Sequence, residues 1–217
     1  MIIECIVGGS FLTNCYIIAD EESKQGIIID PGAQVQEVLD RIDELGLKVD
    51  KIVNTHAHID HASGVQQAKD ALGAKFYLHE KEKPVLDSMP ESALRFGGLP
   101  EFSGVVVPEI DEFLEEGDVV EIGKYKADVL LVPGHTWGSI CLVVDEHIFS
   151  GDTLFAGSVG RVDLTGGTSM QELVGSINKK LMVYPPESKV YPGHGPVTTI
   201  DIEKRSNPFL GGGTLLF

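Results

Sequence analysis

Histidine and aspartate side chains occur at four places along the chain, each within a few residues of the end of a short stretch that is typical of a β-strand. They are the segment 54–61 after the run 51–53, His135 after 127–132, Asp152 after 147–149, and His194 after Val190. Sheet proteins gather functional side chains at the carboxyl ends of strands. The pattern therefore predicts that residues far apart in sequence meet at one edge of a β-structure.

Strand-like and helix-like periodicities alternate along the chain, and neither a repeat nor a linker-like change of composition interrupts them. We expect one domain, 1–217, of mixed strands and helices. The segment 80–102 is rich in proline and glycine, and we expect broken helix and loop over a site there. The predicted helices are 35–45, 62–72 and 170–181, and the predicted strands are 2–7, 15–19, 26–29, 51–54, 75–78, 119–122, 127–132, 139–144, 147–149 and 190–191.

The charge balance excludes several partners. Seventeen Lys and Arg stand against 33 Asp and Glu, a formal net charge of −16. Such a surface binds nucleic acid poorly and is repelled by anionic membranes. No run of about 18 apolar residues and no basic, apolar leader is present, so we expect a cytoplasmic protein. The chain has three cysteines, an odd number, and they are widely spaced: Cys5, Cys15 and Cys141. This pattern predicts buried free thiols.

The spacing within the groups suits metal ligands. Side chains two residues apart on an extended segment point the same way, so His56 and His58 can share one ion. His61 is an odd number of residues from both and would point the other way, unless the chain turns there into the helix expected near Ala62. Asp60 and His61 can then hold a second ion. His135 and His194 would complete the two sets, and the two oxygens of Asp152 could bridge them. Imidazole and carboxylate ligands suit zinc, iron or manganese. His79 and His147 are interpreted as ordinary core or surface residues.

The run His56-Ala57-His58-Ile59-Asp60-His61 resembles the His-x-His-x-Asp-His signature of the metallo-β-lactamase superfamily. His135, Asp152 and His194 follow in that superfamily's order, and the resemblance covers almost the whole chain. It implies an α+β fold, an αββα sandwich of two mixed sheets flanked by helices, with two divalent metal ions at one edge. It further implies that His56, His58 and His135 hold one ion, that Asp60, His61 and His194 hold the other, and that Asp152 bridges them.

Further segments resemble one branch of that superfamily. The runs 158–163 and 166–167 are similar to a loop of glyoxalase II-like thioesterases, and 204–209 is similar to their segment after the last histidine ligand. Antibiotic-degrading members with a cysteine ligand do not fit, because Asp152 stands at the bridging position. Only 23 residues follow His194, which resembles the short hydroxyacylglutathione hydrolase-like branch without the helical C-terminal domain.

This resemblance implies hydrolysis of a small-molecule thioester, such as S-D-lactoylglutathione or another acyl thiol, with zinc as the foremost metal and iron or manganese as alternatives. Asp60 would bind metal and orient the attacking hydroxide. The alternatives are a persulfide dioxygenase with a single iron, a lactonase, and a non-catalytic metal-binding protein. A role like that of the RNA-processing members of the superfamily is disfavoured, because the net charge of this chain is strongly negative and RNA binding needs a basic surface. Arg161 either pairs with Asp163 or binds a substrate carboxylate, and Asp30 is a candidate to orient a metal-binding histidine.

Overall fold

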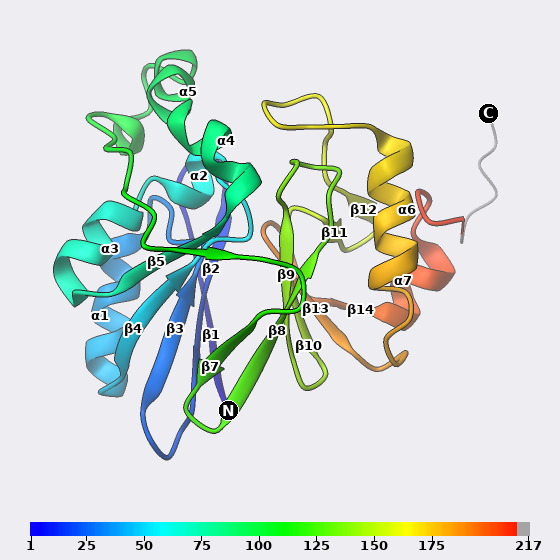
Figure 1. Cartoon of the computed structure of the whole chain (residues 1–217), viewed down its shortest axis with the longest axis horizontal. Coiled ribbons are helices and arrows are strands. Elements are labelled where there is room, and N and C mark those ends of the chain that lie inside the picture. The colour runs from blue at the N-terminus through cyan, green and yellow to red at the C-terminus, as the bar shows by residue number, and fades with distance from the viewer. Residues whose placement is uncertain (212–217) are drawn as a thin grey trace.

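Two six-stranded β-sheets lie face to face at the centre of the protein (Figure 1). The computed structural model describes residues 1–211. The first sheet consists, in spatial order, of β1 (Ile2–Gly8), β2 (Thr13–Ala19), β3 (Gln25–Ile29), β4 (Lys48–Val53), β5 (Lys75–His79) and β6 (Glu112–Leu114). The second consists of β14 (Thr198–Thr199), β13 (Lys189–Pro192), β10 (His147–Gly151), β9 (Ile140–Val144), β8 (Tyr125–Leu131) and β7 (Val119–Ile122).

Both sheets contain parallel and antiparallel pairs, which confirms the predicted mixed character. In the first sheet β1, β2 and β3 are antiparallel neighbours, whereas β3 to β6 run parallel. In the second, β10 and β13 are parallel and every other neighbouring pair is antiparallel. A separate small hairpin is formed by β11 (Leu154–Phe155) and β12 (Ser158–Val159).

Helices cover the outer face of each sheet, so the layers run α, β, β, α (Figure 1). Helices α1 (Val35–Leu45) and α3 (Val65–Leu72) flank the first sheet, and α6 (Met170–Lys180) and α7 (Ile200–Ser206) flank the second. Each buries an apolar stripe, as α1 does with Val38 and Ile42. The αββα sandwich predicted from the sequence is confirmed. Across residues 1–211, no helix combines the length and the apolar character needed to cross a bilayer.

Strand β2 shows how the layers are held together. All seven of its residues are buried. Cys15 and Ile17 pack against the helices on one face, while Tyr16 and Ile18 pack between the two sheets on the other. Because successive side chains of a strand point to opposite faces, a strand buried on both faces is apolar over most of its length, as β2 is from Cys15 to Ala19. The sandwich thus has one core between the sheets and one under each helical layer.

One end of the sandwich is covered by short helices. Strand β4 leads into α2 (Ile59–Ala62), and β5 leads through the 3-10 helix η1 (Glu80–Glu82) into α4 (Lys83–Asp87) and α5 (Met89–Arg95). A second 3-10 helix, η2 (Pro100–Phe102), follows. Helices α2, α4 and α5 lie together at the top of the view in Figure 1. The sequence expectation of broken helix over 80–102 is confirmed.

Two expectations were wrong. The helix predicted over 62–72 is interrupted at Ser63 and Gly64, where the Gly64 amide donates to the carbonyl oxygen of Pro31. A Cβ at Gly64 would collide with the carbonyl oxygen of Gly32, so this tertiary contact ends one helix and starts another. The second error concerns cysteine burial. Cys15 and Cys141 are buried free thiols, but Cys5 is exposed because β1 is the edge strand of its sheet.

Candidate metal centre

The seven residues singled out in the sequence lie at one edge of the sandwich, beyond the carboxyl ends of four strands. His56 and His58 follow β4, and Asp60 and His61 belong to α2. The second sheet supplies the other three, which come after β8, β10 and β13: His135, Asp152 and His194. The first sheet therefore contributes four candidate ligands and the second contributes three, so the cluster lies between the two sheets.

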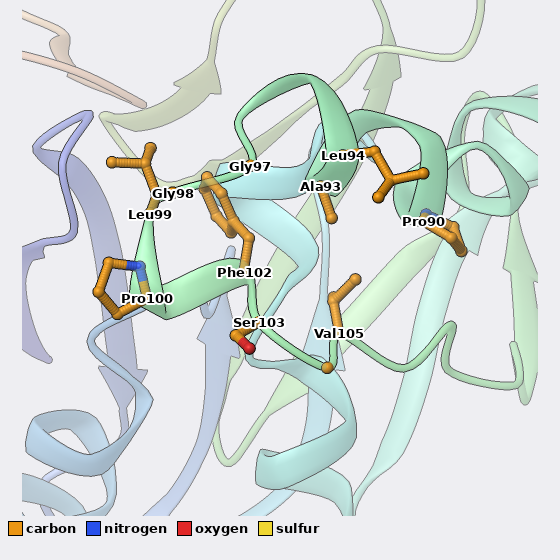
Figure 2. A pocket seen from close by; sticks show the side chains of 11 residues that line it. Pro90, Ala93, Leu94, Gly97, Gly98, Leu99, Pro100, Phe102, Ser103 and Val105 are labelled. Atoms are coloured by element: carbon orange, nitrogen blue, oxygen red, sulfur yellow. The ribbon is translucent and has the colours of Figure 1, made fainter.

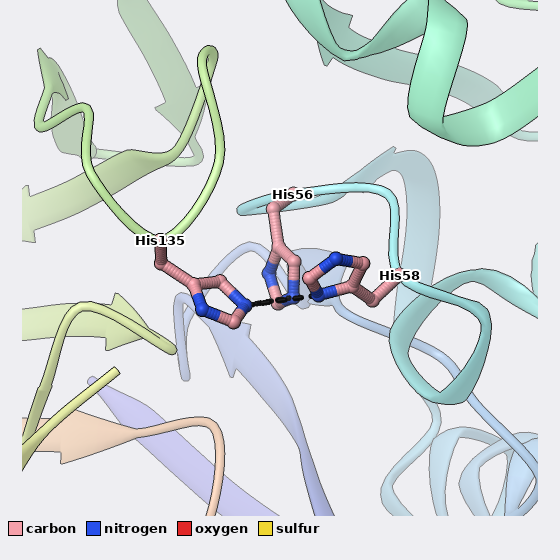
Figure 3. Close-up of side chains that lie close together, drawn as sticks. All are labelled: His56, His58 and His135. Atoms are coloured by element: carbon pink, nitrogen blue, oxygen red, sulfur yellow. Dashed lines mark hydrogen bonds between the residues drawn. The ribbon is translucent and has the colours of Figure 1, made fainter. Parts of the chain in front are cut away.

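Three of these histidines face one another, and we call them the three-histidine group: His56, His58 and His135. The Nε2 atom of His135 lies 3.2 Å from Nε2 of His56 and 2.9 Å from Nδ1 of His58. Figure 3 shows the three rings pointing toward a common centre, with His135 approaching from the opposite loop. His56 and His58 point the same way, as their spacing predicted. Their ligand atoms are close enough to hold one ion.

A second group adjoins it, made of Asp60, His61 and His194, and we call it the aspartate group. The Nε2 atoms of His61 and His194 are 3.3 Å apart, and Asp60 Oδ2 lies 3.5 and 3.3 Å from them. Asp152 contacts both groups. Its Oδ1 is 3.3 Å from His61 Nε2, and its Oδ2 is 3.7 Å from His135 Nε2. Asp152 therefore stands where a bridging carboxylate was predicted.

The far ring nitrogen of each histidine contacts an oxygen outside the cluster. Nδ1 of His61 donates to Asp30 Oδ2, and Nδ1 of His56 donates to Thr55 Oγ1, whose hydroxyl in turn donates to Asp30. The remaining three donate to backbone carbonyl oxygens: His58 to Thr165, His135 to Arg161, and His194 to Phe11. In the neutral rings, these bonds fix one tautomer and leave a lone pair on the inward nitrogen.

Asp30 has the position expected of a residue that orients a ligand. It is buried, and it accepts hydrogen bonds from the Thr55 amide at 2.7 Å and from His61 Nδ1 at 3.0 Å. Its backbone is left-handed, with φ +54°, in the turn that ends β3. That conformation is uncommon outside glycine, and Asp tolerates it better than most residues. The carboxylate thus holds the His61 ring directly and the His56 ring through the Thr55 hydroxyl.

The electrostatics of the two groups differ. Burial lowers the pKa of His135 to about 4, and burial together with the neighbouring His61 ring lowers the pKa of His56 well below its usual value. In the aspartate group, burial opposes protonation but the carboxylates of Asp152 and Asp60 outweigh it. They raise the pKa of His61 well above its usual value and that of His194 to about 9. The carboxylates therefore create a potential that favours a cation.

These features fit metal ions. Nitrogen and oxygen ligands about 2.0–2.2 Å from a tetrahedral ion lie roughly 3.3–3.6 Å apart, close to the separations seen within both groups. Lone pairs facing one another repel unless a cation or a proton lies between them. In addition, the buried Oδ1 of Asp152 has no hydrogen-bond partner among the described residues. An orphaned carboxylate oxygen at this depth is costly, and a metal ion would satisfy it.

A pocket of about 490 Å³ opens over the cluster. Asp60, His135, Asp152 and His194 lie in its wall, and the rings of Phe11, Phe96 and Phe155 supply an apolar lining. Arg161 also lines it, but its guanidinium forms two bonds with Asp163, at 3.0 and 2.9 Å. Of the two roles considered for Arg161, the structure shows the pairing with Asp163.

Sequence reasoning missed two residues that position the ligand loops. Glu82 is fully buried, and its carboxylate accepts the amides of Ala57 at 2.9 Å and Gly138 at 2.8 Å. It thereby ties the His56–His58 loop to the loop of His135. Asn14 donates to the carbonyl oxygens of Pro192 and Gly195, on either side of His194. A polar residue at the start of an otherwise apolar strand was a signal for Asn14, but nothing distinguished Glu82 from its charged neighbours.

The fold and the cluster define a class: αββα sandwich proteins with histidine and aspartate groups, able to bind metal ions, at the edge between two sheets. A family model described as the metallo-beta-lactamase superfamily matches residues 8–194, and the chain belongs to this superfamily of metallo-hydrolases. Among curated relatives, it is similar to the Haemophilus influenzae protein named hydroxyacylglutathione hydrolase GloC. The two are 38% identical over 97% of this chain and 98% of the relative.

Solved structures show the same fold. A structure described as the BLEG-1 B3 metallo-beta-lactamase matches with a TM-score of 0.88 and 33% identity, over 97% of this chain and 100% of that one. TTHA1623 in a di-iron-bound form matches with a TM-score of 0.83 and 35% identity, over 95% and 100%. ETHE1 from Myxococcus xanthus matches with a TM-score of 0.81 and 29% identity, over 99% and 86%.

Proposed function

We propose that the protein is a metal-dependent thioesterase that hydrolyses an acyl thiol such as S-D-lactoylglutathione. The observation that carries the proposal is the convergence of five inward imidazole nitrogens and two carboxylates in one cluster, five of whose residues line an open pocket. The name of the GloC relative, which the chain matches over nearly its whole length, supports the same activity. The di-iron-bound neighbour supports a site for two ions.

The three-histidine group would hold one divalent ion, the aspartate group would hold the other, and Asp152 would bridge them. Zinc is our first choice, because imidazole and carboxylate ligands suit it, with iron or manganese as alternatives. When bound, such ions lower the pKa of a water molecule to about 7 and polarise a carbonyl oxygen. Asp60 would orient the attacking oxygen through Oδ2, which the Thr13 hydroxyl holds in place from 3.1 Å.

A thioester suits this arrangement. The attacking oxygen bonds to the carbonyl carbon, the carbon–sulfur bond breaks, and the electron pair leaves on sulfur. Because a thiol has a pKa near 8.5, the sulfur leaves as a thiolate without a proton from the protein. The pocket has an apolar wall of phenylalanine rings beside the polar cluster, which suits an acyl thiol with one apolar part and one part facing the metals.

The test combines metal analysis with activity. Protein expressed in minimal medium with zinc, iron or manganese is analysed for metal content and assayed on S-D-lactoylglutathione. We expect two metal equivalents and hydrolysis that disappears on chelation. Protein with both metals bound that fails to hydrolyse a panel of thioesters and lactones would exclude the proposal. One bound iron, together with oxygen uptake on glutathione persulfide, would instead support the dioxygenase alternative, with which the likeness to ETHE1 is consistent.

A further inference from the structure

Helix α5 contributes side chains to two cavities of different chemistry. Pro90, Ala93 and Leu94 line a cavity of about 540 Å³ between α5 and the segment that runs to Val105 (Figure 2). No charged or metal-binding side chain of residues 1–211 lines this cavity. The other face of α5 borders the pocket over the metal centre through Ser92 and Arg95, together with Phe96, the residue that caps the end of the helix. Only that face therefore offers groups able to recognise a polar substrate.

The three residues on the metal-facing side of α5 are spaced to act together. Positions three and four apart share one face of a helix, so Ser92, Arg95 and Phe96 project to the same side. Phe96 packs edge-on against Phe11, with ring centroids 5.1 Å apart. The contact joins the end of α5 to the turn between β1 and β2, whose Phe11 carbonyl accepts the bond from His194. The Arg95 side of the pocket is thus tied to the metal-binding loops.

Arg95 is unusual among the arginines of this acidic protein. The chain has four arginines, all within the described residues, and three of them form ion pairs: Arg41 with Glu4, Arg161 with Asp163, and Arg205 with Asp201. Arg95 forms no ion pair or side-chain hydrogen bond within residues 1–211. The carboxylates that line its pocket are already committed, because Asp163 holds Arg161, and Asp60 and Asp152 are candidate metal ligands. A cation without a counterion therefore borders the substrate pocket.

We propose that Arg95 is a specificity-determining residue, which binds a carboxylate on the substrate and makes the enzyme prefer anionic thioesters over neutral ones. This inference rests on the proposed thioesterase function. The planar guanidinium matches the two oxygens of a carboxylate, and the apolar rings of Phe11 and Phe96 line the same pocket. The carboxylate can belong to the thiol part or to the acyl part of the substrate, and matched substrates distinguish these two sources.

The substrates form two pairs that differ in one charge. S-acetylmercaptoacetate and S-acetylmercaptoacetamide test a carboxylate on the thiol part. The succinyl and butanoyl thioesters of N-acetylcysteamine test one on the acyl part. For wild type we expect a lower KM for the anionic member of at least one pair, and this preference should weaken as salt is added. In Arg95→Ala that KM should rise roughly tenfold with kcat nearly unchanged, and the neutral member should be unaffected.

Two variants make the result specific. Arg205→Ala removes the same charge from an exposed position on α7, outside the pocket, and should keep the wild-type preference. Arg95→Lys keeps the charge without the planar fork, so we expect it to retain part of the preference. Equal kcat/KM for both members of both pairs in the wild type would overturn the proposal. An equal loss on charged and neutral substrates in Arg95→Ala would also overturn it.

A binding measurement separates this inference from the proposed function. S-ethylmercaptoacetate carries the carboxylate but has a thioether in place of the thioester, so it binds without reaction. Calorimetric titration should show that the metal-loaded wild type binds it more tightly than Arg95→Ala does. If the wild type hydrolyses none of the thioesters, the proposed function fails, and the titration still decides whether Arg95 binds a carboxylate. 4-(Ethylthio)butanoate is the matching thioether for a carboxylate on the acyl part. Equal affinity of the two proteins for both thioethers would reject the role of Arg95.

Discussion

At the residue scale, the inward ring nitrogens of the cluster depend on acceptors outside it. Asp30 is the most connected of these, because it accepts from the His61 ring directly and from the hydroxyl of Thr55, which holds His56. Its charge therefore acts on both groups, although its direct contact is to the aspartate group. Removing an acceptor of this kind leaves the ligand in place but no longer fixes its tautomer.

Asp30→Asn should accordingly weaken metal binding without removing a ligand. We expect the affinity of the aspartate group to fall about 10–100-fold, since partners of metal-binding histidines commonly contribute that much. Titration with a chelator, read as metal retained per chain, measures the loss. Asp20→Asn is the matched control, because Asp20 is also a buried aspartate that caps a turn, but it contacts Ser23 and Glu22 rather than the cluster. Equal metal retention in the two variants would contradict the role given to Asp30.

Glu82 supplies a second residue-scale prediction. Its carboxylate accepts the amides of Ala57 and Gly138, so Glu82→Gln would place an amide NH₂ against one backbone donor. We expect a loss of about 1–3 kcal/mol in the free energy of unfolding for that unsatisfied donor. Metal should be lost selectively from the three-histidine group.

Glu203→Gln separates these two effects of the Glu82 substitution. Glu203 is equally buried and accepts from the Gly157 amide and the Asn207 side chain, at a distance from the three-histidine group. Its substitution should lower stability comparably, as measured by urea unfolding, while the three-histidine group keeps its metal. If both variants lost the same metal equivalent, Glu82 would be a structural residue only.

The residues of the site differ in how well the sequence alone predicts them. The seven candidate ligands were identifiable because their types and spacing are unusual, and the structure brings all seven together. Asp30 could be suggested because it ends a strand. Glu82 could not, since its burial depends on packing against loops that are 25 and 56 residues away in the sequence. For Arg161 the sequence left two roles open, pairing with Asp163 or binding a substrate carboxylate, and only the structure distinguished them.

At the scale of elements, long periodic segments were predictable and short ones were not. Helix α1 agrees with its expected range because apolar spacing and the left-handed Gly46 are local signals. Strands β6, β11, β12 and β14 have two or three residues each and were missed. Strands this short exist only because a neighbouring strand pairs with them, so local sequence carries little trace of them. Helix α7 was also missed, although Thr199 caps its start.

Two glycines in helical surroundings should respond oppositely to substitution by alanine. Gly175 lies inside α6, and an added Cβ there would meet no neighbouring atom, so Gly175→Ala should stabilise the protein by about 0.5–1 kcal/mol. At Gly64 the added Cβ would meet the Gly32 and Pro31 carbonyl oxygens, so Gly64→Ala should destabilise by roughly 1–3 kcal/mol. Denaturant unfolding of the two variants measures the change in the free energy of unfolding, which should be positive for Gly175→Ala and negative for Gly64→Ala. A stable Gly64→Ala protein would mean that the break between α2 and α3 is not set by this contact.

At the scale of the whole molecule, the candidate metal groups join the two sheets. His56 and His58 belong to the first sheet's edge and His135 to the second, while Asp60 and His61 face His194 across the same boundary. Besides the candidate ligands, this edge is connected by the contacts of β2 with the His194 loop, including the Asn14 amide bonded to the Gly193 carbonyl oxygen. It is also connected by Glu82, which accepts the amides of Ala57 and Gly138. Ions bound here would therefore act as crosslinks between halves of the sandwich.

Metal removal should then lower the stability of the entire fold, because an ion that binds only the folded state stabilises it by mass action. With free zinc buffered at 100 times its dissociation constant, each site should contribute about 2.7 kcal/mol to the free energy of unfolding. Thermal unfolding across a series of zinc buffers should show Tm rising with free zinc. Asp152→Ala removes the one side chain that contacts both groups, so its Tm should depend less steeply on zinc. A wild-type Tm independent of zinc would show that zinc does not bind the folded protein in preference to the unfolded chain.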